Sequence, residues 1–196
     1  TIKYINGTYN GPVDENFKRH GVGTFTFDDG MSFEGTFNND VIIKGKFTYA
    51  DGDVYEGEFN KGEKQGFGTY KYANGDVYAG EWEKDKRKGK GKHTEKKSGN
   101  TYGGKWQNDE FQEGTVKFTF EGGSVYEGAW KKGQRHGQGQ QKYGNGDFYR
   151  GEWKHDKKNG RGSIHYKDGS VYNGEWLDDK KHTVTEYTVE ANDGFK

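Results

Sequence analysis

Residues 54–75 read VYEGEFNKGEKQGFGTYKYANG, and this stretch decides the fold. Residues 54–59 alternate, with Tyr55, Gly57 and Phe59 on one face of an extended chain and glutamates on the other. Residues 60–65 are polar with a central glycine, which favours a hairpin loop. Residues 66–72 alternate again, and Asn74-Gly75 favours a tight type I′ turn into the next strand. The stretch therefore predicts a two-stranded β-hairpin followed by a turn.

The same pattern recurs along the whole chain. An aromatic residue is followed two positions later by glycine eight times, at intervals of 22–24 residues: Tyr9, Phe33, Tyr55, Tyr78, Tyr102, Tyr126, Tyr149 and Tyr172. A period in this range indicates a repeat architecture in which each unit packs on its neighbours. We therefore expect an all-β fold, a single-layer antiparallel meander of about seven stacked hairpins that is elongated, twisted and open. It should form one domain over residues 1–196, with a capping strand and tail at 183–196.

Composition limits both the core and the partners. The 196 residues carry 31 basic and 31 acidic side chains, and this zero net charge argues against nucleic acid as a partner. Hydrophobic residues make up 28% and aromatic residues 16%, which suits a thin sheet with one aromatic face. Cysteine is absent, and no apolar run is long enough for a membrane span or signal peptide. Because the chain starts at Thr1 without methionine, we expect a fragment or processed form.

The strand glycines have a packing reason. A glycine inside a strand costs about 0.5–1 kcal/mol relative to alanine. An aromatic ring lying across the bare backbone recovers part of that cost. With two or three glycines in each hairpin, we expect one face to be tiled with rings over glycine troughs.

The combination of Tyr-Glu-Gly-Glu-Phe/Trp, a basic glycine turn, His/Gln-Gly-x-Gly, Tyr-x-Tyr and Ala-Asp/Asn-Gly resembles the MORN repeat. The resemblance covers roughly residues 5–182, with clear copies beginning at Tyr55, Tyr78, Tyr126 and Tyr149. It implies a non-enzymatic assembly platform at cytoskeletal structures, cilia or membrane contacts. It also implies an intracellular, cytoplasmic protein and the possibility of homodimers formed through the sheet ends.

Four copies depart from the pattern. The copy at Tyr78 has Gly89 and Gly91 but continues Lys92-His93-Thr94-Glu95, without rings. Ile43 replaces the first glycine of the pair in the copy at Phe33. The copy at Tyr102 keeps only Gly114 and has two additional residues before Phe118. The last copy continues into residues 183–189, which have strong strand propensity and no glycine pair, as expected of a capping strand.

The aromatic face is the first candidate site. Exposed aromatic surface commonly marks a protein interface, so we expect these rings to line a groove for a helix or an extended peptide. Packing of the rings on one another as a plain core is the competing interpretation of any single ring. The predicted groove residues are Tyr55, Tyr78, Trp82, Trp106, Tyr126, Trp130, Tyr149, Trp153 and Trp176.

The basic loops are the alternative site. In a meander, alternate turns lie on opposite long edges, which gives one basic and one acidic edge. A basic edge could bind anionic lipid at about 1 kcal/mol per well-placed charge, although solvated turns explain the same pattern. The predicted lipid-binding residues are Lys84, Lys86, Arg87, Lys88, Lys90 and Lys92.

We expect no catalytic residue, metal or cofactor. A flat polar face offers its glutamates no pocket that would perturb them, and His20 and His136 occupy equivalent, distant repeat positions. Three functions remain open: a protein-binding scaffold, a peripheral membrane module, and a targeting module joined to an enzyme outside these residues.

Overall fold

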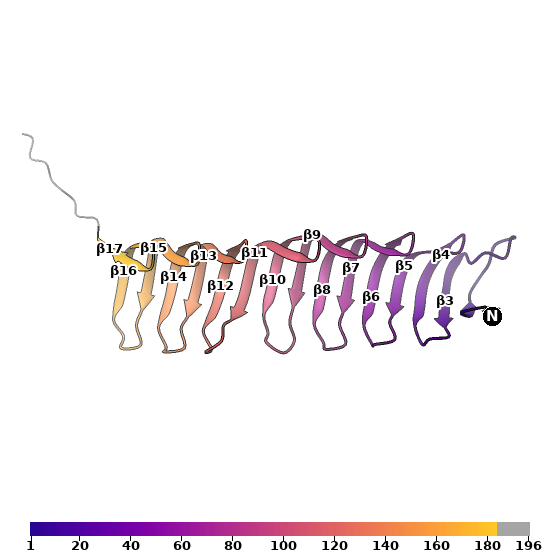
Figure 1. Cartoon of the computed structure of the whole chain (residues 1–196), viewed down its shortest axis with the longest axis horizontal. Coiled ribbons are helices and arrows are strands. Elements are labelled where there is room, and N and C mark those ends of the chain that lie inside the picture. Colours follow the sequence, from indigo (N-terminus) through magenta and orange to yellow (C-terminus); the bar gives the residue numbers. More distant parts are fainter. Residues whose placement is uncertain (184–196) are drawn as a thin grey trace, which may run out of the picture.

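The computed structural model describes residues 1–183 as one antiparallel sheet. Each strand pairs with the next along the chain, from β1–β2 to β16–β17. The described part contains strands and no helix, and Figure 1 shows the hairpins side by side in a single elongated row. The predicted single-layer meander is confirmed. The strands are β1 Ile2–Tyr4, β2 Gly7–Asn10, β3 Gly21–Phe27, β4 Ser32–Asn38, β5 Val41–Thr48, β6 Val54–Asn60, β7 Glu63–Lys71, β8 Val77–Glu83, β9 Lys86–Thr94, β10 Thr101–Gln107, β11 Glu110–Thr119, β12 Val125–Lys131, β13 Gln134–Lys142, β14 Phe148–Lys154, β15 Lys157–His165, β16 Val171–Leu177 and β17 Lys180–His182.

Two-residue turns occupy one long edge, which we call the clasp edge. Lys61 and Gly62 join β6 to β7 with φ angles of 50° and 84°, and Lys84 and Asp85 join β8 to β9 with 49° and 66°. Two consecutive left-handed residues are the signature of a type I′ turn, whose twist matches that of the strands. The predicted loop at 60–65 is therefore shorter than expected, because its outer residues already pair in the ladder. The turns of this edge are 39–40, 61–62, 84–85, 108–109, 132–133, 155–156 and 178–179.

Wider turns occupy the opposite long edge, which we call the wide-turn edge. The N–H of Gly75 donates to the carbonyl of Tyr72 at 2.8 Å, and the N–H of Tyr72 donates to the carbonyl of Asp76 at 2.9 Å. Gly75 has a φ of 90°, whereas Asn74 is not left-handed. The predicted type I′ turn at Asn74-Gly75 is therefore wrong. A three-residue loop needs only its last residue in the left-handed region, and glycine supplies it.

Tyr55, Tyr78, Tyr126 and Tyr149 each lie over a pair of facing glycines. Gly57 of β6 pairs with Gly68 of β7, and a Cβ on Gly57 would meet the hydroxyl oxygen of Tyr55 at 2.5 Å. The hydroxyl of Tyr55 donates to the carbonyl of Glu58 at 3.0 Å, which fixes the ring along its own strand. The predicted packing of rings over bare backbone is confirmed. Each such ring covers two glycines, one on its own strand and one on the next strand.

A register step divides the row into two halves. Within each half the glycines face each other across hairpins, as in the pairs Gly68 with Gly80 and Gly139 with Gly151. Between β11 and β12 the pairs are Gly114 with Trp130 and Val116 with Gly128, a shift of two residues. The two additional residues in the copy at Tyr102 account for the step. The buried core accordingly forms two clusters.

The predicted capping strand and tail at 183–196 lie outside the described residues, apart from Thr183. The single-domain boundary stays a prediction.

Candidate partner-binding face

The predicted groove residues form the buried core of the sheet. Trp130 is half-buried, and the other eight side chains are 0–5% exposed: Tyr55, Tyr78, Trp82, Trp106, Tyr126, Tyr149, Trp153 and Trp176. These eight rings have almost no surface left for a partner. Their side of the sheet can bind a partner only through neighbouring side chains.

The core rings form an edge-on ladder that joins consecutive hairpins. Trp82 packs against Tyr55 at 5.5 Å and 83°, and against Tyr78 at 5.2 Å and 88°. Its indole N–H donates to the carbonyl of Gly68 at 3.1 Å. Burial raises the pKa of Tyr78 and that of Tyr126 to about 12, so both phenols remain protonated donors at neutral pH. The ladder therefore has a structural role, and the same edge-on contact recurs from one hairpin to the next.

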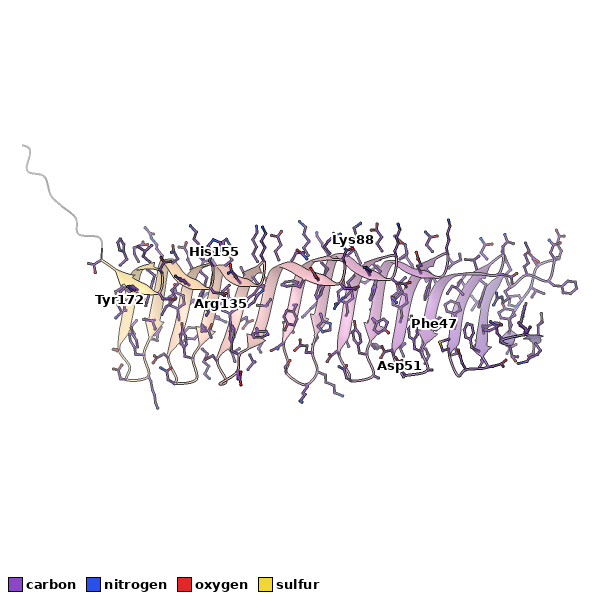
Figure 2. The ribbon with its side chains drawn as sticks, in the orientation of Figure 1. Phe47, Asp51, Lys88, Arg135, His155 and Tyr172 are labelled. Carbon is purple, nitrogen blue, oxygen red and sulfur yellow. The ribbon has the colours of Figure 1, made fainter. Side chains whose placement is uncertain are left out.

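A second row of rings lies beside this ladder and keeps exposed surface. Its members are the last aromatic residues before the wide turns: Phe27, Tyr49, Tyr72, Phe120, Tyr143 and Tyr166. They stack on the ring two residues earlier where that residue is aromatic, as Tyr49 does on Phe47 at 4.7 Å and Tyr72 on Tyr70 at 4.6 Å. Figure 2 shows Phe47 on the strands, between the wide-turn edge at Asp51 and the clasp edge at Lys88 and His155. We call these six residues the outer ring row. None of the six was predicted as a site residue, although the sequence shows an aromatic residue before each of these turns.

Basic side chains cover the ring face from the clasp edge. The guanidinium of Arg135 lies 4.2 Å from the ring centre of Trp153, its Nη2 donates to the carbonyl of Asp156 at 2.6 Å, and its Nη1 donates to Gln141 at 2.9 Å. The Asp156 carboxylate also accepts the backbone N–H of Arg135 at 2.8 Å. Because Asp156 belongs to the next turn, this contact joins neighbouring hairpins. We call it the clasp.

The clasp recurs along the chain with nearly the same number of residues between its basic residue and its aspartate. A basic residue donates its backbone N–H to an aspartate 21 or 22 residues later in the pairs Arg19–Asp40, Lys64–Asp85, Arg87–Asp109, Arg135–Asp156 and Lys158–Asp179. The basic residues of the clasp edge were predicted from the sequence, but the aspartates within this edge were not. Their recurrence 21 or 22 residues after a basic residue is the feature of the sequence that could have predicted the clasp.

The predicted lipid-binding residues fall into separate environments. Arg87 is engaged in a clasp with Asp109 and lies 4.5 Å from the ring centre of Trp106. Lys88 forms an ion pair with Glu83. The exposed members are Lys84, Lys86, Lys90 and Lys92.

Lysines oppose one another on the outer face, which is the side of the sheet away from the rings. Lys90 faces Lys105 directly across β9 and β10. Lys92 pairs with Ala79 on one side and Gly103 on the other, at positions where other repeats carry glutamate. This part of the outer face is positively charged although the whole chain is neutral.

His93 interrupts the ring face. Its ring lies 6.0 Å from that of Tyr72 and 6.1 Å from that of Tyr102, and its Nδ1 is buried without a hydrogen-bond partner within the described structure. Loss of solvent, followed by repulsion from Arg87, lowers the pKa of His93, while Asp76 and Glu95 oppose this shift.

We expect the protein to lose stability as the pH falls below about 6.5, because the unfolded chain then binds a proton that folded His93 resists. His93→Tyr places a tyrosine where the preceding repeat has Tyr70, and it should flatten this dependence. Urea unfolding of both proteins between pH 5 and 7.5 provides the measurement. Equal pH slopes would show that His93 is not responsible.

The described residues also bear on other kinds of site. Within 1–183, no group of three or more His, Cys, Asp or Glu side chains is placed to hold a metal ion. The same range contains no helix long and apolar enough to cross a membrane.

These features define an open, single-layer β-ribbon built from repeated hairpins with glycine-seated tyrosines. The chain belongs to the MORN-repeat family. The model of the MORN repeat matches residues 18–32, 44–54, 55–77, 78–94, 126–148, 149–171 and 172–182. The unmatched stretch at 95–125 contains the copy at Tyr102 and the register step.

Solved structures provide a weaker similarity. A TCP domain of SAS-4 (dCPAP) from Drosophila melanogaster, in complex with a proline-rich motif of Ana2 (dSTIL), is 16% identical with a TM-score of 0.40. The match covers 84% of this chain and 94% of that one. The TCP10 domain of Danio rerio CPAP, in complex with a STIL peptide, is 11% identical with a TM-score of 0.26, over 86% of this chain and 84% of that one. These scores support no argument about partners. No curated protein matches the chain.

Proposed function

We propose that this protein is a non-enzymatic scaffold that binds a helix or extended segment of a partner protein on its ring face. The observation that carries the proposal is the outer ring row, which presents three half-buried aromatic side chains in each half of the sheet. Membership of the MORN-repeat family supports a scaffold role. The predicted location at cytoskeletal or ciliary structures, and the predicted homodimer through sheet ends, belong to this proposal.

The outer ring row provides the contacts for a partner. Half-buried rings offer apolar surface with little entropy to lose, and tyrosines add hydroxyl groups for hydrogen bonds. The buried groove residues predicted from the sequence hold this surface in place. A partner would contact Tyr72 and Tyr143, which pack against the buried clusters that contain Trp82 and Trp153.

Proximity labelling followed by pull-down tests this function. We expect Tyr72→Ser together with Tyr143→Ser to weaken binding of a direct partner at least tenfold while leaving the urea midpoint near that of the wild type. Phe17→Ser is the matched control, because it removes a 77% exposed ring that belongs neither to the outer ring row nor to its supporting core. A partner that binds the double variant as tightly as the wild type would contradict the proposal.

Peripheral lipid binding is the second candidate, and the opposed lysines on the outer face favour it. Anionic lipid attracts such charges at about 1 kcal/mol each, and salt screens the attraction. If lipid is the ligand, Lys90→Glu with Lys92→Glu should abolish co-sedimentation with anionic vesicles at low salt. Arg87 is unsuitable for this test because its clasp stabilises the fold. Equal sedimentation of neutral and anionic vesicles would exclude this mode.

A further inference from the structure

One hollow of the described structure lies away from the ring face. It is a furrow of about 860 Å³ that crosses β7 to β12 near the clasp edge. Its lining includes Phe67, Glu81, Trp82, Lys105, Glu113 and Lys131. Apart from Trp82, these side chains belong to the outer face.

The furrow lies where the repeat is irregular. Gly114 pairs with Trp130 at the register step, which brings Lys131 opposite Glu113. The Glu113 carboxylate then lies 3.2 Å from the Lys131 ammonium and 3.6 Å from that of Lys105. At the other end, the ring of Phe67 is 61% exposed. The furrow therefore combines an apolar end wall with an arrangement of charges that other repeats lack.

The pairing of the sheet limits what can bind there. Each strand from β7 to β12 pairs on both sides, so the furrow has no open strand edge to which a peptide could add a strand. Its six strands span five spacings of about 4.8 Å, or roughly 24 Å. This length matches a helix of about 16 residues at 1.5 Å per residue.

The charges of the lining differ between the two ends. On β8 and β9, Glu81, Glu83 and Lys88 leave one net negative charge. On β10 to β12 and the turn after β12, Lys105, Lys131 and Lys132 outweigh Glu113, which leaves two net positive charges. A helix carries partial positive charge at its amino end and partial negative charge at its carboxyl end. The two ends therefore complement one orientation of a helix.

We propose that this furrow binds an amphipathic partner helix of about 16 residues, with its amino end over β8 and its carboxyl end over β12. The apolar face of the helix packs against Phe67 and the methylene stems of Lys105 and Lys131. Basic residues in the first turn and acidic residues in the last turn complete the match. This surface is separate from the outer ring row, so the scaffold would hold two partners at once.

Peptide display tests the proposal without a known partner. A library of 18-residue helical peptides is selected on the wild-type protein and depleted on Phe67→Gln/Lys131→Glu. We expect enriched peptides with one apolar face, a basic first turn and an acidic last turn. Binding is then measured by fluorescence anisotropy with synthetic peptides of the enriched sequences.

The variants separate this site from the ring face. We expect Phe67→Gln and Lys131→Glu each to raise the Kd at least tenfold, and a peptide with exchanged end charges to bind at least tenfold more weakly. Tyr72→Ser should leave the Kd unchanged, and failure of the ring-row test would not affect this result. Absence of enrichment, selection of extended proline-containing peptides, or loss of binding in Tyr72→Ser would overturn the proposal. Because both furrow residues are exposed, unchanged urea midpoints serve as the folding control.

Discussion

Gly80→Ala is expected to lower the free energy of unfolding by about 3 kcal/mol, a large effect for one methyl group. A Cβ at Gly80 would lie 2.6 Å from the hydroxyl oxygen of Tyr78 and 2.7 Å from the carbonyl oxygen of Lys90. The Tyr78 ring cannot move aside, because Trp82 and Trp106 pack edge-on against it. Accommodation therefore requires β8 and β9 to separate, which breaks ladder hydrogen bonds. Urea unfolding followed by tryptophan fluorescence measures the change.

Gly103→Ala is the matched control in a neighbouring strand. The nearest atoms to a Cβ there are the carbonyl oxygen of Thr115 at 3.8 Å and Cγ of Lys92 at 3.9 Å, so the methyl group has space. Removing the backbone freedom of glycine should stabilise the protein by about 0.5–1 kcal/mol. The two substitutions thus have opposite expected signs. If both substitutions destabilised the protein equally, the close contact between the tyrosine ring and the glycine would not explain why glycine recurs two residues after the repeat aromatic residue in this chain.

The sequence was sufficient for the architecture because the same local signal occurs in every repeat. Alternation at 54–59 and 66–72 identifies strands and faces, and a one-layer sheet follows from too few aliphatic residues for a second layer. The turn types were less predictable. Asn74-Gly75 suits a type I′ turn locally, but loop length is set by the pairing of Tyr72 with Asp76 across the hairpin.

The candidate site was predictable only in part, because exposure depends on contacts between hairpins. The alternation places Tyr55 and Tyr70 on one face, yet Tyr55 is fully buried and Tyr70 is half-buried. The difference arises from Trp82, which belongs to the next repeat and packs on Tyr55. Such contacts can be predicted only when the pairing register between neighbouring hairpins is known. The same holds for the clasp and for the register step at β11.

The two faces of the ribbon therefore have different physical roles. On the ring face, a phenylalanine or tryptophan of one hairpin covers the repeat ring of its neighbour in the regular repeats, so binding surface is left mainly towards the wide-turn edge. On the outer face, the regular repeats present mainly polar side chains, with Phe67 as an exposed ring, and the pairing of side chains changes where the repeat is irregular, as at Gly103 and Glu113. Specific recognition on the outer face is thus expected at the irregular repeats.

Removal of a clasp is expected to have the second large effect. Arg135→Ala should lower the free energy of unfolding by about 2–4 kcal/mol, since it removes charge-assisted hydrogen bonds and a cation–π contact together. The side chain of Arg135 is only 19% exposed, so water cannot readily replace these contacts. Gln141, which is 2% exposed, would also lose the donor to its amide oxygen at 2.9 Å. A buried acceptor left without a donor adds to the loss.

Arg161→Ala provides the matched control, because it removes the same side chain from a solvated site. The Arg161 side chain is 88% exposed and contacts Glu175 at 3.1 Å, and exposed ion pairs of this kind contribute about 0–1 kcal/mol. We expect Arg161→Ala to leave the urea midpoint nearly unchanged and Arg135→Ala to lower it clearly. Hydrogen exchange should show the loss of protection in Arg135→Ala centred on β13 to β15, where the clasp joins two hairpins. Similar midpoints for the two variants would mean that backbone pairing and the ladder of core rings hold neighbouring hairpins together without the clasp, and that the basic residues of the clasp edge are available to a ligand.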